Sequence, residues 1–323
     1  MQRLKVLFIP LLTVTRHWQD AVVAAIGDRH DLAIYDHQRP ALEQFAGRTV
    51  VIEAGGVSAT DEMKDAATDT QLWQIMGTGL DHVDIDYLKS KGFIVTNTPG
   101  QFSSVALGEC ALMFILMLAR GYCEARANFD AGTMYKPFGY GLDGTTLGII
   151  GFGASGLELA RRAKPFGMRI QAIDVRPIEP GILDEIQPEF LGGPDELDQV
   201  VAAADYLSLH LHLTDVTRHI IDARRIGMMK PAACLINVAR GALIDEAAMH
   251  EALLNGRIGG AGIDVFSTEP PDLTLPVYQL PNMVVTPHIS GGTDSTARAR
   301  AGAVSENVDR VAQGLEPLYR VDG

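Results

Sequence analysis

The sequence contains few of the residues that mark disulfide-rich, metal-binding or aromatic-rich proteins. Its 323 residues include three cysteines, two tryptophans and 7% aromatic residues in all. The cysteines, Cys110, Cys123 and Cys234, are odd in number, and their spacing fits neither a metal site nor a redox pair. We therefore expect reduced, mostly buried thiols and predict no metal site.

Positive charge is also scarce. Lysine and arginine total 27 against 40 aspartates and glutamates, which gives a net charge of −13. No basic cluster of the kind that neutralises a phosphate backbone is present, so we expect no nucleic acid partner. The net negative charge repels anions, so a site for an anionic substrate needs hydrogen-bond donors and positively charged side chains close by.

Long apolar runs are missing as well. The most apolar stretch, 110–119, is about half the length of a membrane helix and is flanked by Glu109 and Arg120. We expect a buried helix there and no membrane partner. The apolar run at 5–10 has the length of a strand and no small-residue cleavage site behind it, so we expect a strand there, no secretory signal and a cytoplasmic location.

Strand-like and helical patterns alternate along the chain, and its length with 47% hydrophobic residues favours two domains. Alternation of this kind predicts an α/β fold with two doubly wound parallel sheets. The expected strands are 50–54, 73–76 and 94–96, then 147–150, 170–173, 206–209, 234–238 and 262–265, with a last one at 284–286. Long helical patterns cover 104–120 and 293–313, and the Pro- and Gly-rich segment 177–194 is expected to be a surface excursion.

A glycine motif follows the expected strand 147–150. Gly151 permits a tight turn, Gly153 lets the backbone approach a pyrophosphate, and Gly156 lets the next helix pack on the sheet. By itself the motif is equally compatible with an ordinary glycine-rich turn. Asp174 ends the next expected strand, where a carboxylate accepts hydrogen bonds from ribose hydroxyls and repels a 2′-phosphate, so NAD is favoured over NADP. Arg176 weakens this preference, because a guanidinium pairs with phosphate.

Three further residues suggest chemistry. Arg240 follows a buried strand, where a guanidinium can grip a carboxylate, although a surface ion pair would use the same residue. Glu269 and His288 taken singly are compatible with a charged loop residue and a core histidine. As a pair they describe an imidazole oriented by a carboxylate, whose pKa is raised and which can give or take a proton.

In order and spacing, these motifs resemble the D-isomer-specific 2-hydroxyacid dehydrogenases. The resemblance rests on the glycine motif with Asp174, on Asn-Val-Ala-Arg-Gly at 237–241, on the segment 264–270 and on Pro-His at 287–288. Gly-Thr-Gly-Leu-Asp at 77–81 and Asn-Thr-Pro-Gly at 97–100 resemble the substrate-domain signature of the family. The match extends over nearly the whole chain.

The resemblance implies a mechanism and an architecture. Arg240 would bind the substrate, His288 would be the acid/base supported by Glu269, and the amides of Thr78 and Gly79 would bind the substrate carboxylate. Asp264 would hold the nicotinamide carboxamide. The implied cofactor-binding residues are Thr78, Gly151, Gly153, Ala154, Ser155, Gly156, Asp174, Leu211, His212, Val238, Ala239, Arg240, Asp264, His288, Ser290 and Gly291.

The implied domains are a flavodoxin-like substrate domain, 1–100 with 289–323, and a Rossmann-type NAD domain inserted at 101–288. Homodimers through the cofactor domain are also implied, and the apolar helix at 104–120 suits either that interface or the core of its own chain. The expected reaction interconverts a small 2-keto acid and its D-2-hydroxy acid, with glyoxylate, hydroxypyruvate, pyruvate and bulkier acids all open.

The chain departs from the family pattern in places. It has one residue more between Asn97 and Glu109, and His212 replaces a frequent proline. A phosphoglycerate dehydrogenase remains an alternative, although the sequence ends at Gly323 without room for the regulatory domain that many of them carry. An NAD(H)-sensing, corepressor-like protein is a second alternative, disfavoured by the three catalytic residue types. Glu269 points away from the formate-oxidising relatives, which generally carry an amide there.

Overall fold

The computed structural model describes residues 2–11, 16–56 and 58–323, and the chain divides into two compact units. Unit 1 consists of Met1–Ser103 and Gly292–Gly323, and unit 2 is Ser104–Gly291. The boundaries thus follow residues 103 and 291, rather than 100 and 288 as expected from the sequence. The long apolar helix begins only at Ser104, and the turn after His288 is hydrogen-bonded to Asp264 within unit 2.

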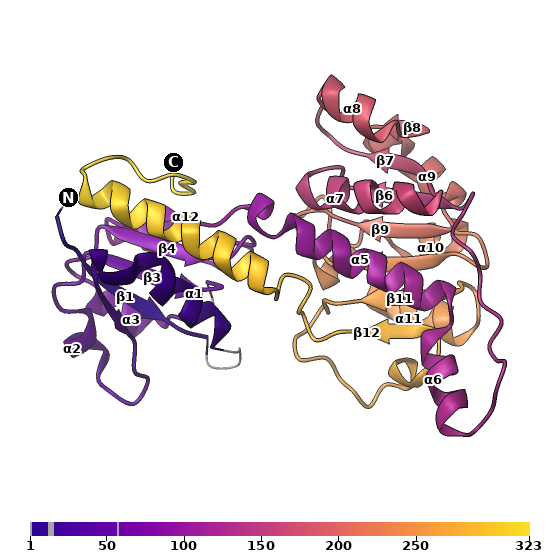
Figure 1. Ribbon diagram of the computed structural model, residues 1–323, viewed down its shortest axis with the longest axis horizontal. Helices are drawn as coiled ribbons and strands as arrows, with labels where there is room; N and C mark the ends of the chain where they lie inside the picture. Colours follow the sequence, from indigo (N-terminus) through magenta and orange to yellow (C-terminus); the bar gives the residue numbers. More distant parts are fainter. Residues whose placement is uncertain (1, 12–15, 57) are drawn as a thin grey trace. The chain divides into compact units, whose positions relative to one another are not determined.

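Unit 1 is a parallel sheet of five strands in the order β2-β1-β3-β4-β5, which is the flavodoxin-like arrangement. Apolar side chains of α1 and α12 cover one face, and those of α2, α3 and α4 cover the other. Figure 1 shows α12, in yellow, lying across this sheet beside α1. The elements are β1 (Lys5–Ile9), α1 (His17–Ile26), β2 (Asp31–Ile34), α2 (Ala41–Phe45), β3 (Val50–Ala54), α3 (Asp61–Ala66), β4 (Leu72–Met76), α4 (Ile85–Ser90), β5 (Ile94–Thr96) and α12 (Asp294–Ala312).

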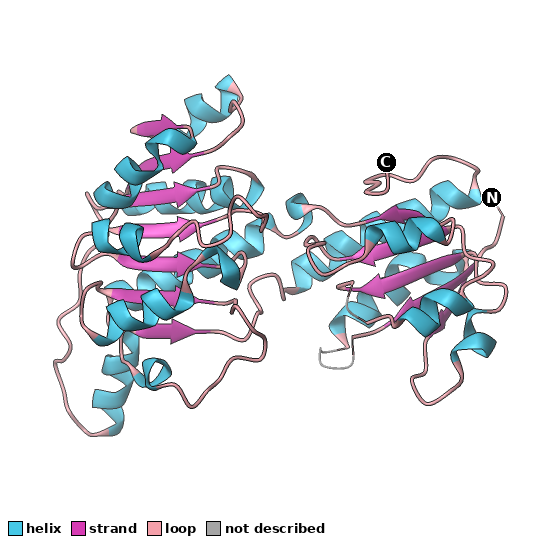
Figure 2. Ribbon diagram, turned by 180° about the vertical axis from the view of Figure 1, so that it is seen from behind, coloured by secondary structure: helices cyan, strands magenta, loops and turns pink. Residues whose placement is uncertain are grey.

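Unit 2 is a parallel sheet of seven strands in the order β12-β11-β10-β9-β6-β7-β8. Counted from its own first strand, six of them have the Rossmann order 3-2-1-4-5-6, with β12 added beyond. Figure 2 shows these strands as a row of arrows pointing the same way. The strands are β6 (Thr146–Ile150), β7 (Arg169–Ile173), β8 (Phe190–Gly192), β9 (Tyr206–Leu209), β10 (Cys234–Asn237), β11 (Gly260–Ile263) and β12 (Met283–Val285).

Helices cover both faces of the unit 2 sheet. One core lies under α5, α7 and α8, and the other under α9, α10 and α11. Gly262 in β11 lets α5 approach closely, because a Cβ there would lie 2.6 Å from the Cβ of Phe114. The helices are α5 (Ser104–Ala119), α6 (Tyr122–Asp130), α7 (Ala154–Ala163), α8 (Pro180–Ile186), α9 (Leu197–Ala203), α10 (Ala223–Met228) and α11 (Glu246–Leu254).

The predicted fold class is confirmed by the two parallel sheets, and every strand expected from the sequence is present within a few residues. Two edge strands were not predicted, β2 and β8. The expectation of a surface excursion at 177–194 was wrong in part, because this segment contains α8 and β8. Ile182 and Ile186 pack on the core, and β8 pairs with β7.

The expectation of mostly buried thiols was also wrong in part. Cys234 is buried, but Cys110 and Cys123 are only half-buried because their positions on α5 and α6 lie at the margin of the core. Burial raises the pKa of the Cys234 and Cys110 thiols to about 12, which favours the protonated thiol at neutral pH.

Across the described ranges, no single helix has both the length and the apolar composition needed to span a membrane. The pair α5 and α6 passes that test only when taken together, and it is bent by 57°.

Candidate active site

Three candidate residues follow three neighbouring strands of the unit 2 sheet. Arg240 lies just after β10, Glu269 in the loop after β11, and His288 just after β12. These strands are adjacent and parallel, so their carboxyl ends meet at one edge of the sheet. Ligands of open α/β sheets bind at this edge.

His288 and Glu269 form a hydrogen-bonded pair. Nδ1 of His288 lies 2.8 Å from Oε2 of Glu269, and their side chains are 48% and 39% exposed. The other carboxylate oxygen of Glu269 accepts the N–H of Phe266 at 3.0 Å, which fixes the carboxylate. The bond at Nδ1 orients the ring and directs Nε2 away from Glu269.

This pairing shifts both groups toward their charged forms. The hydrogen bond to Glu269 raises the pKa of His288, against the opposing effects of burial and of the charge on Arg240. Burial favours neutral Glu269, but the hydrogen bonds from His288 and Phe266 together with the charge of Arg240 outweigh it and lower the pKa of Glu269. His288 therefore keeps its proton to a higher pH than a free histidine.

Asp264 holds the turn that carries His288. Its side chain is fully buried at the end of β11, and its carboxylate accepts hydrogen bonds from Thr286 Oγ1 at 2.5 Å, Ile289 N at 2.8 Å and Ser290 N at 2.8 Å. Its carbonyl accepts the N–H of His288. These three bonds use most of the roughly four acceptor positions of a carboxylate.

The backbone of His288 itself is unusual. Its φ is +55°, in the left-handed region, which few residues other than glycine adopt although histidine is among those enriched there. The bonds to Asp264 hold the turn in this conformation. Strain of this kind persists where the surrounding structure over-determines it, and it concentrates at functional sites.

Asn237 fixes the turn that carries Arg240. It is fully buried at the end of β10, where its side chain donates to the carbonyl of Arg240 at 2.8 Å and accepts the N–H of Ala239 at 3.1 Å. The following Gly241 touches the chain that leads to Glu269, because a Cβ at 241 would lie 1.9 Å from the carbonyl carbon of Phe266. Arg240 and Glu269 are thus kept close by direct backbone packing.

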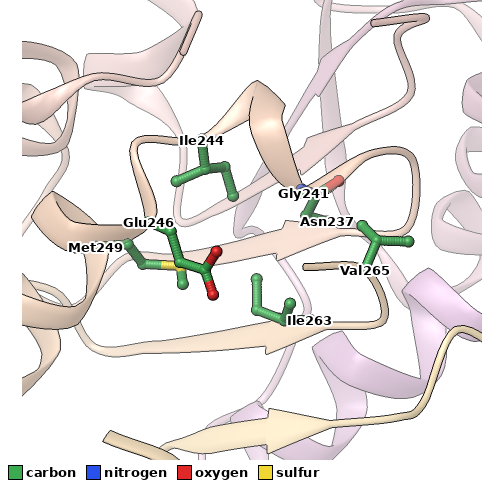
Figure 3. Close-up of a pocket in the computed structure, with 7 residues that line it drawn as sticks. All are labelled: Asn237, Gly241, Ile244, Glu246, Met249, Ile263 and Val265. Carbon is green, nitrogen blue, oxygen red and sulfur yellow. The ribbon is translucent and has the colours of Figure 1, made fainter. Parts of the chain in front are cut away.

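Glu246, which the sequence analysis did not single out, supports the same loop. Its carboxylate accepts the N–H of Ser267 at 3.0 Å and the hydroxyl of Tyr278 at 3.2 Å. An acidic residue in the first turn of a helix is ordinary, so the sequence offered no signal for this role. Figure 3 shows Glu246 beside a cavity of about 10 Å³, room for one water at most and not for a substrate. The lining residues are Asn237, Gly241, Ile244, Glu246, Met249, Ile263 and Val265.

The glycine motif forms the tight turn between β6 and α7. Gly151 has φ +95°, and a Cβ there would lie 2.5 Å from the carbonyl oxygen of His210. A Cβ at Gly156 would lie 2.2 Å from the carbonyl oxygen of Gly151. Helix α7 begins at Ala154 and Ser155, so its first N–H groups face the loop and are suited to an anion.

Asp174 and Arg176 form an ion pair next to this loop. Two bonds join their side chains, at 3.1 and 3.3 Å, and the Arg176 guanidinium lies 3.1 Å from where a Cβ of Gly153 would be. Asp174 is nearly buried whereas Arg176 is exposed. Both groups that bear on the choice between NAD and NADP are therefore at the glycine loop.

The remaining candidates differ in what they can present to a ligand. Leu211 and His212 follow β9, with His212 exposed and Leu211 packed against Gly151. Val238 and Ala239 have only 2% and 9% of their surface exposed, so any ligand contact there falls on the backbone. Ser290 is buried and donates its N–H to the carboxylate of Asp264. Gly291 is the last residue of unit 2.

Thr78 and Gly79 belong to unit 1. They follow β4 at the carboxyl edge of that sheet and are half-buried. Among the described residues, no group of three or more His, Cys, Asp or Glu side chains is arranged to hold a metal ion.

Comparison with known proteins identifies the family. Residues 112–290 match the model of the D-isomer specific 2-hydroxyacid dehydrogenase, NAD binding domain. The chain is 36% identical over 270 residues to hydroxypyruvate reductase of Thermotoga maritima, covering 82% of this chain and 84% of that protein. The chain belongs to the D-isomer specific 2-hydroxyacid dehydrogenases.

One relative of this dehydrogenase is longer, and a solved structure has the same fold. It is 34% identical to D-3-phosphoglycerate dehydrogenase of Methanocaldococcus jannaschii over 84% of its own length, but it spans only about half (51%) of that protein. Among solved structures, D-lactate dehydrogenase from Aquifex aeolicus, complexed with NAD and lactic acid, superposes with a TM-score of 0.80 at 26% identity over 99% of both chains.

The residues of this dehydrogenase fit the NAD that its family binds. The glycines at 151 and 156 let the turn pack closely where any Cβ would clash with backbone, and α7 starts directly after this turn. Asp174 stands at the end of β7, where ribose hydroxyls are bound in such domains. The predictions of family and of NAD as cofactor are thus confirmed.

Proposed function

We propose that the protein reduces small 2-keto acids to D-2-hydroxy acids, and runs the reverse oxidation, with His288 as acid/base. The observation that carries this proposal is the 2.8 Å pair of His288 and Glu269 with the charge of Arg240 acting on both. An acid/base, a carboxylate that orients it and a cation for an anionic substrate are what the interconversion of a ketone and an alcohol next to a carboxylate requires.

NAD, when bound, accepts or supplies the hydride at substrate C2. His288 gives a proton from Nε2 to the carbonyl oxygen in reduction and takes it from the hydroxyl in oxidation. Glu269 keeps the ring oriented and stabilises the imidazolium through Nδ1. Arg240 binds the substrate carboxylate and polarises the carbonyl, because a guanidinium donates several hydrogen bonds in one plane.

Unit 1 is proposed to bind a substrate carboxylate through the N–H groups of Thr78 and Gly79. Throughout the described residues, no hydrogen bond from another part of the chain engages these two N–H groups. Two adjacent N–H donors at the end of a strand suit an anion. The names of the relatives, hydroxypyruvate reductase among them, support a small substrate side chain.

The decisive experiment measures oxidation of NADH and NADPH at matched concentrations by the purified protein. The panel contains glyoxylate, hydroxypyruvate, pyruvate, phenylpyruvate and phosphohydroxypyruvate, and Arg240→Ala is measured beside the natural protein. A rate with one acid that Arg240→Ala suppresses supports the proposal. A preference for phosphohydroxypyruvate would favour a phosphoglycerate dehydrogenase, and tight NADH binding without turnover would favour an NAD(H) sensor.

Glu269→Gln is expected to move the pH profile of reduction. The glutamine keeps the size, but it replaces the charge-assisted hydrogen bond at Nδ1 with a neutral one and removes the negative charge, and the lost bond and charge both raise the pKa of His288 in the natural protein. Reduction needs protonated His288, so the fall of kcat/KM with rising pH should begin at a lower pH in the variant. A profile of kcat/KM between pH 5 and 10 tests this, and an unshifted profile would contradict the pairing as the source of the raised pKa.

We also propose that two copies associate through unit 2, as the resemblance implies. Exposed aromatic side chains in and after α6 support this, since such residues are enriched at protein interfaces. Phe129 is 68% exposed, Tyr135 98% and Phe138 93%. Sedimentation of the purified protein as a monomer at micromolar concentration would refute the association.

A further inference from the structure

Arg300 contacts the loop in unit 1 that is proposed to bind substrate. Its Nη2 donates a hydrogen bond to Oγ1 of Thr78 at 3.1 Å, and the two residues are 222 positions apart in sequence. Arg300 lies on α12, and both residues are half-buried. The contact joins the last long helix of the chain to the carboxyl end of β4.

The hydroxyl of Thr78 is used entirely inside the protein. It accepts from Arg300 and donates to the carbonyl of Thr98 at 3.1 Å. The carbonyl of Thr78 in turn accepts from Nδ2 of Asn97 at 3.1 Å. The side chain and the carbonyl of Thr78 are therefore both held by hydrogen bonds. These bonds fix the loop, and the loop sets the direction of the Thr78 N–H.

Arg300 is itself held in place. Its guanidinium carbon lies 5.5 Å from the centre of the Trp18 ring, a cation–π distance, and the neighbouring Ala301 and Val304 are buried in the unit 1 core. Two residues earlier, Arg298 has the opposite character. It is 68% exposed and pairs with Asp294 four positions away. The helix thus carries one arginine toward the loop and one toward solvent.

We propose that Arg300 is a positioning residue for substrate binding, which acts through Thr78 to aim the N–H groups of Thr78 and Gly79 at the substrate carboxylate. This inference rests on the proposed function. A charge-assisted hydrogen bond is stronger and more directional than a neutral one, so it restrains the loop more tightly than the Thr98 contact alone. Its positive charge also lies beside the loop in a protein of net charge −13, where it favours an anion.

Arg300→Met tests this directly, because methionine keeps an unbranched chain and removes charge and donors. The KM for the best 2-keto acid should rise by roughly 10-fold or more, as expected for loss of a hydrogen bond to a charged group, whereas kcat and the Kd for NADH should hardly change. Calorimetry with oxamate, an unreactive 2-keto acid analogue, in the presence of NADH should show the same weakening. Arg300→Lys keeps the charge and one donor and should restore part of the affinity.

Arg298→Met is the matched control, being the same substitution on the same helix with the side chain in solvent, and its KM should equal that of the natural protein. If Arg300→Met does not fold, Thr78→Val removes the acceptor while keeping the loop N–H groups, and it should give the same rise in KM. The inference is overturned if soluble Arg300→Met has an unchanged KM. It is also overturned if Arg300→Met loses kcat and oxamate binding equally and Arg300→Lys restores neither. If the natural protein turns over no 2-keto acid, the proposed function fails, and weaker oxamate binding by Arg300→Met would still support the inference.

Discussion

Replacing His288 with asparagine is expected to lower kcat for reduction of the preferred 2-keto acid by roughly 10²- to 10⁴-fold, the usual contribution of a general acid. Asparagine cannot donate a proton to a carbonyl oxygen as an imidazolium does, but it tolerates the left-handed backbone at this position. The loss of kcat would therefore reflect the missing proton donor and not a distorted backbone turn. Steady-state kinetics measures turnover, which should fall, and NADH fluorescence titration measures cofactor affinity, which should stay nearly unchanged.

His288→Ala should lose turnover equally, with an added loss of stability because alanine is strained at φ +55°. His37→Ala, which changes an exposed histidine of unit 1, is the control and should leave kcat as it is. If His288→Asn lowered NADH affinity and turnover in the same proportion, His288 would serve the cofactor site and the acid/base assignment would be wrong.

The His288–Glu269 pair also sets the direction in which pH acts on stability. The pKa of His288 is raised, so its contribution is complete below the unfolded pKa and is lost as pH rises through the folded pKa. The pKa of Glu269 is lowered, so its contribution exists above the unfolded pKa and is lost as pH falls through the folded pKa. The pair therefore stabilises unit 2 only in the interval between these limits, and partial exposure keeps the effect small.

The sequence predicted the buried strands well, and it placed the three residues proposed for catalysis at strand ends, for physical reasons. Central parallel strands are apolar on both faces, so runs such as Val50–Ala54 and Tyr206–Leu209 stand out. The edge strands β2 and β8 have no buried residue and carry weaker patterns, which explains why they were missed, whereas the edge strands β5 and β12 each bury two residues. Arg240, Glu269 and His288 follow strand ends, and parallel order makes such positions converge.

The supporting residues were harder to foresee. Nothing in the sequence shows that Asp264 turns its carboxylate onto the His288 turn, or that Glu246 reaches the loop before Glu269, because both depend on side-chain direction. Arg300 lies 222 residues from Thr78, in a helix that contains three arginines and no distinguishing motif. Contacts between distant segments become visible only once the helix is placed on its sheet.

Gly156→Ala is expected to abolish useful cofactor binding. The added methyl group would lie 2.2 Å from the carbonyl oxygen of Gly151, a backbone atom that cannot move without opening the turn between β6 and α7. Overpacking of this kind costs about 1–3 kcal/mol or more, and it displaces the helix N-terminus from the phosphates. We expect the Kd for NADH to rise by roughly 100-fold or more, equivalent to about 2.8 kcal/mol, with a lower melting temperature.

Gly181→Ala provides the matched control, because it makes the same change in α8 of the same unit where no atom lies within 4 Å of the new methyl group. Its NADH affinity and melting temperature should stay close to those of the natural protein, since surface substitutions are usually within about 0.5 kcal/mol of neutral. Fluorescence titration and thermal unfolding with and without NADH distinguish the two variants. If Gly156→Ala bound NADH as tightly as Gly181→Ala, close approach of helix to strand would not be what the cofactor requires, and the phosphates would have to be held elsewhere along the edge of the sheet.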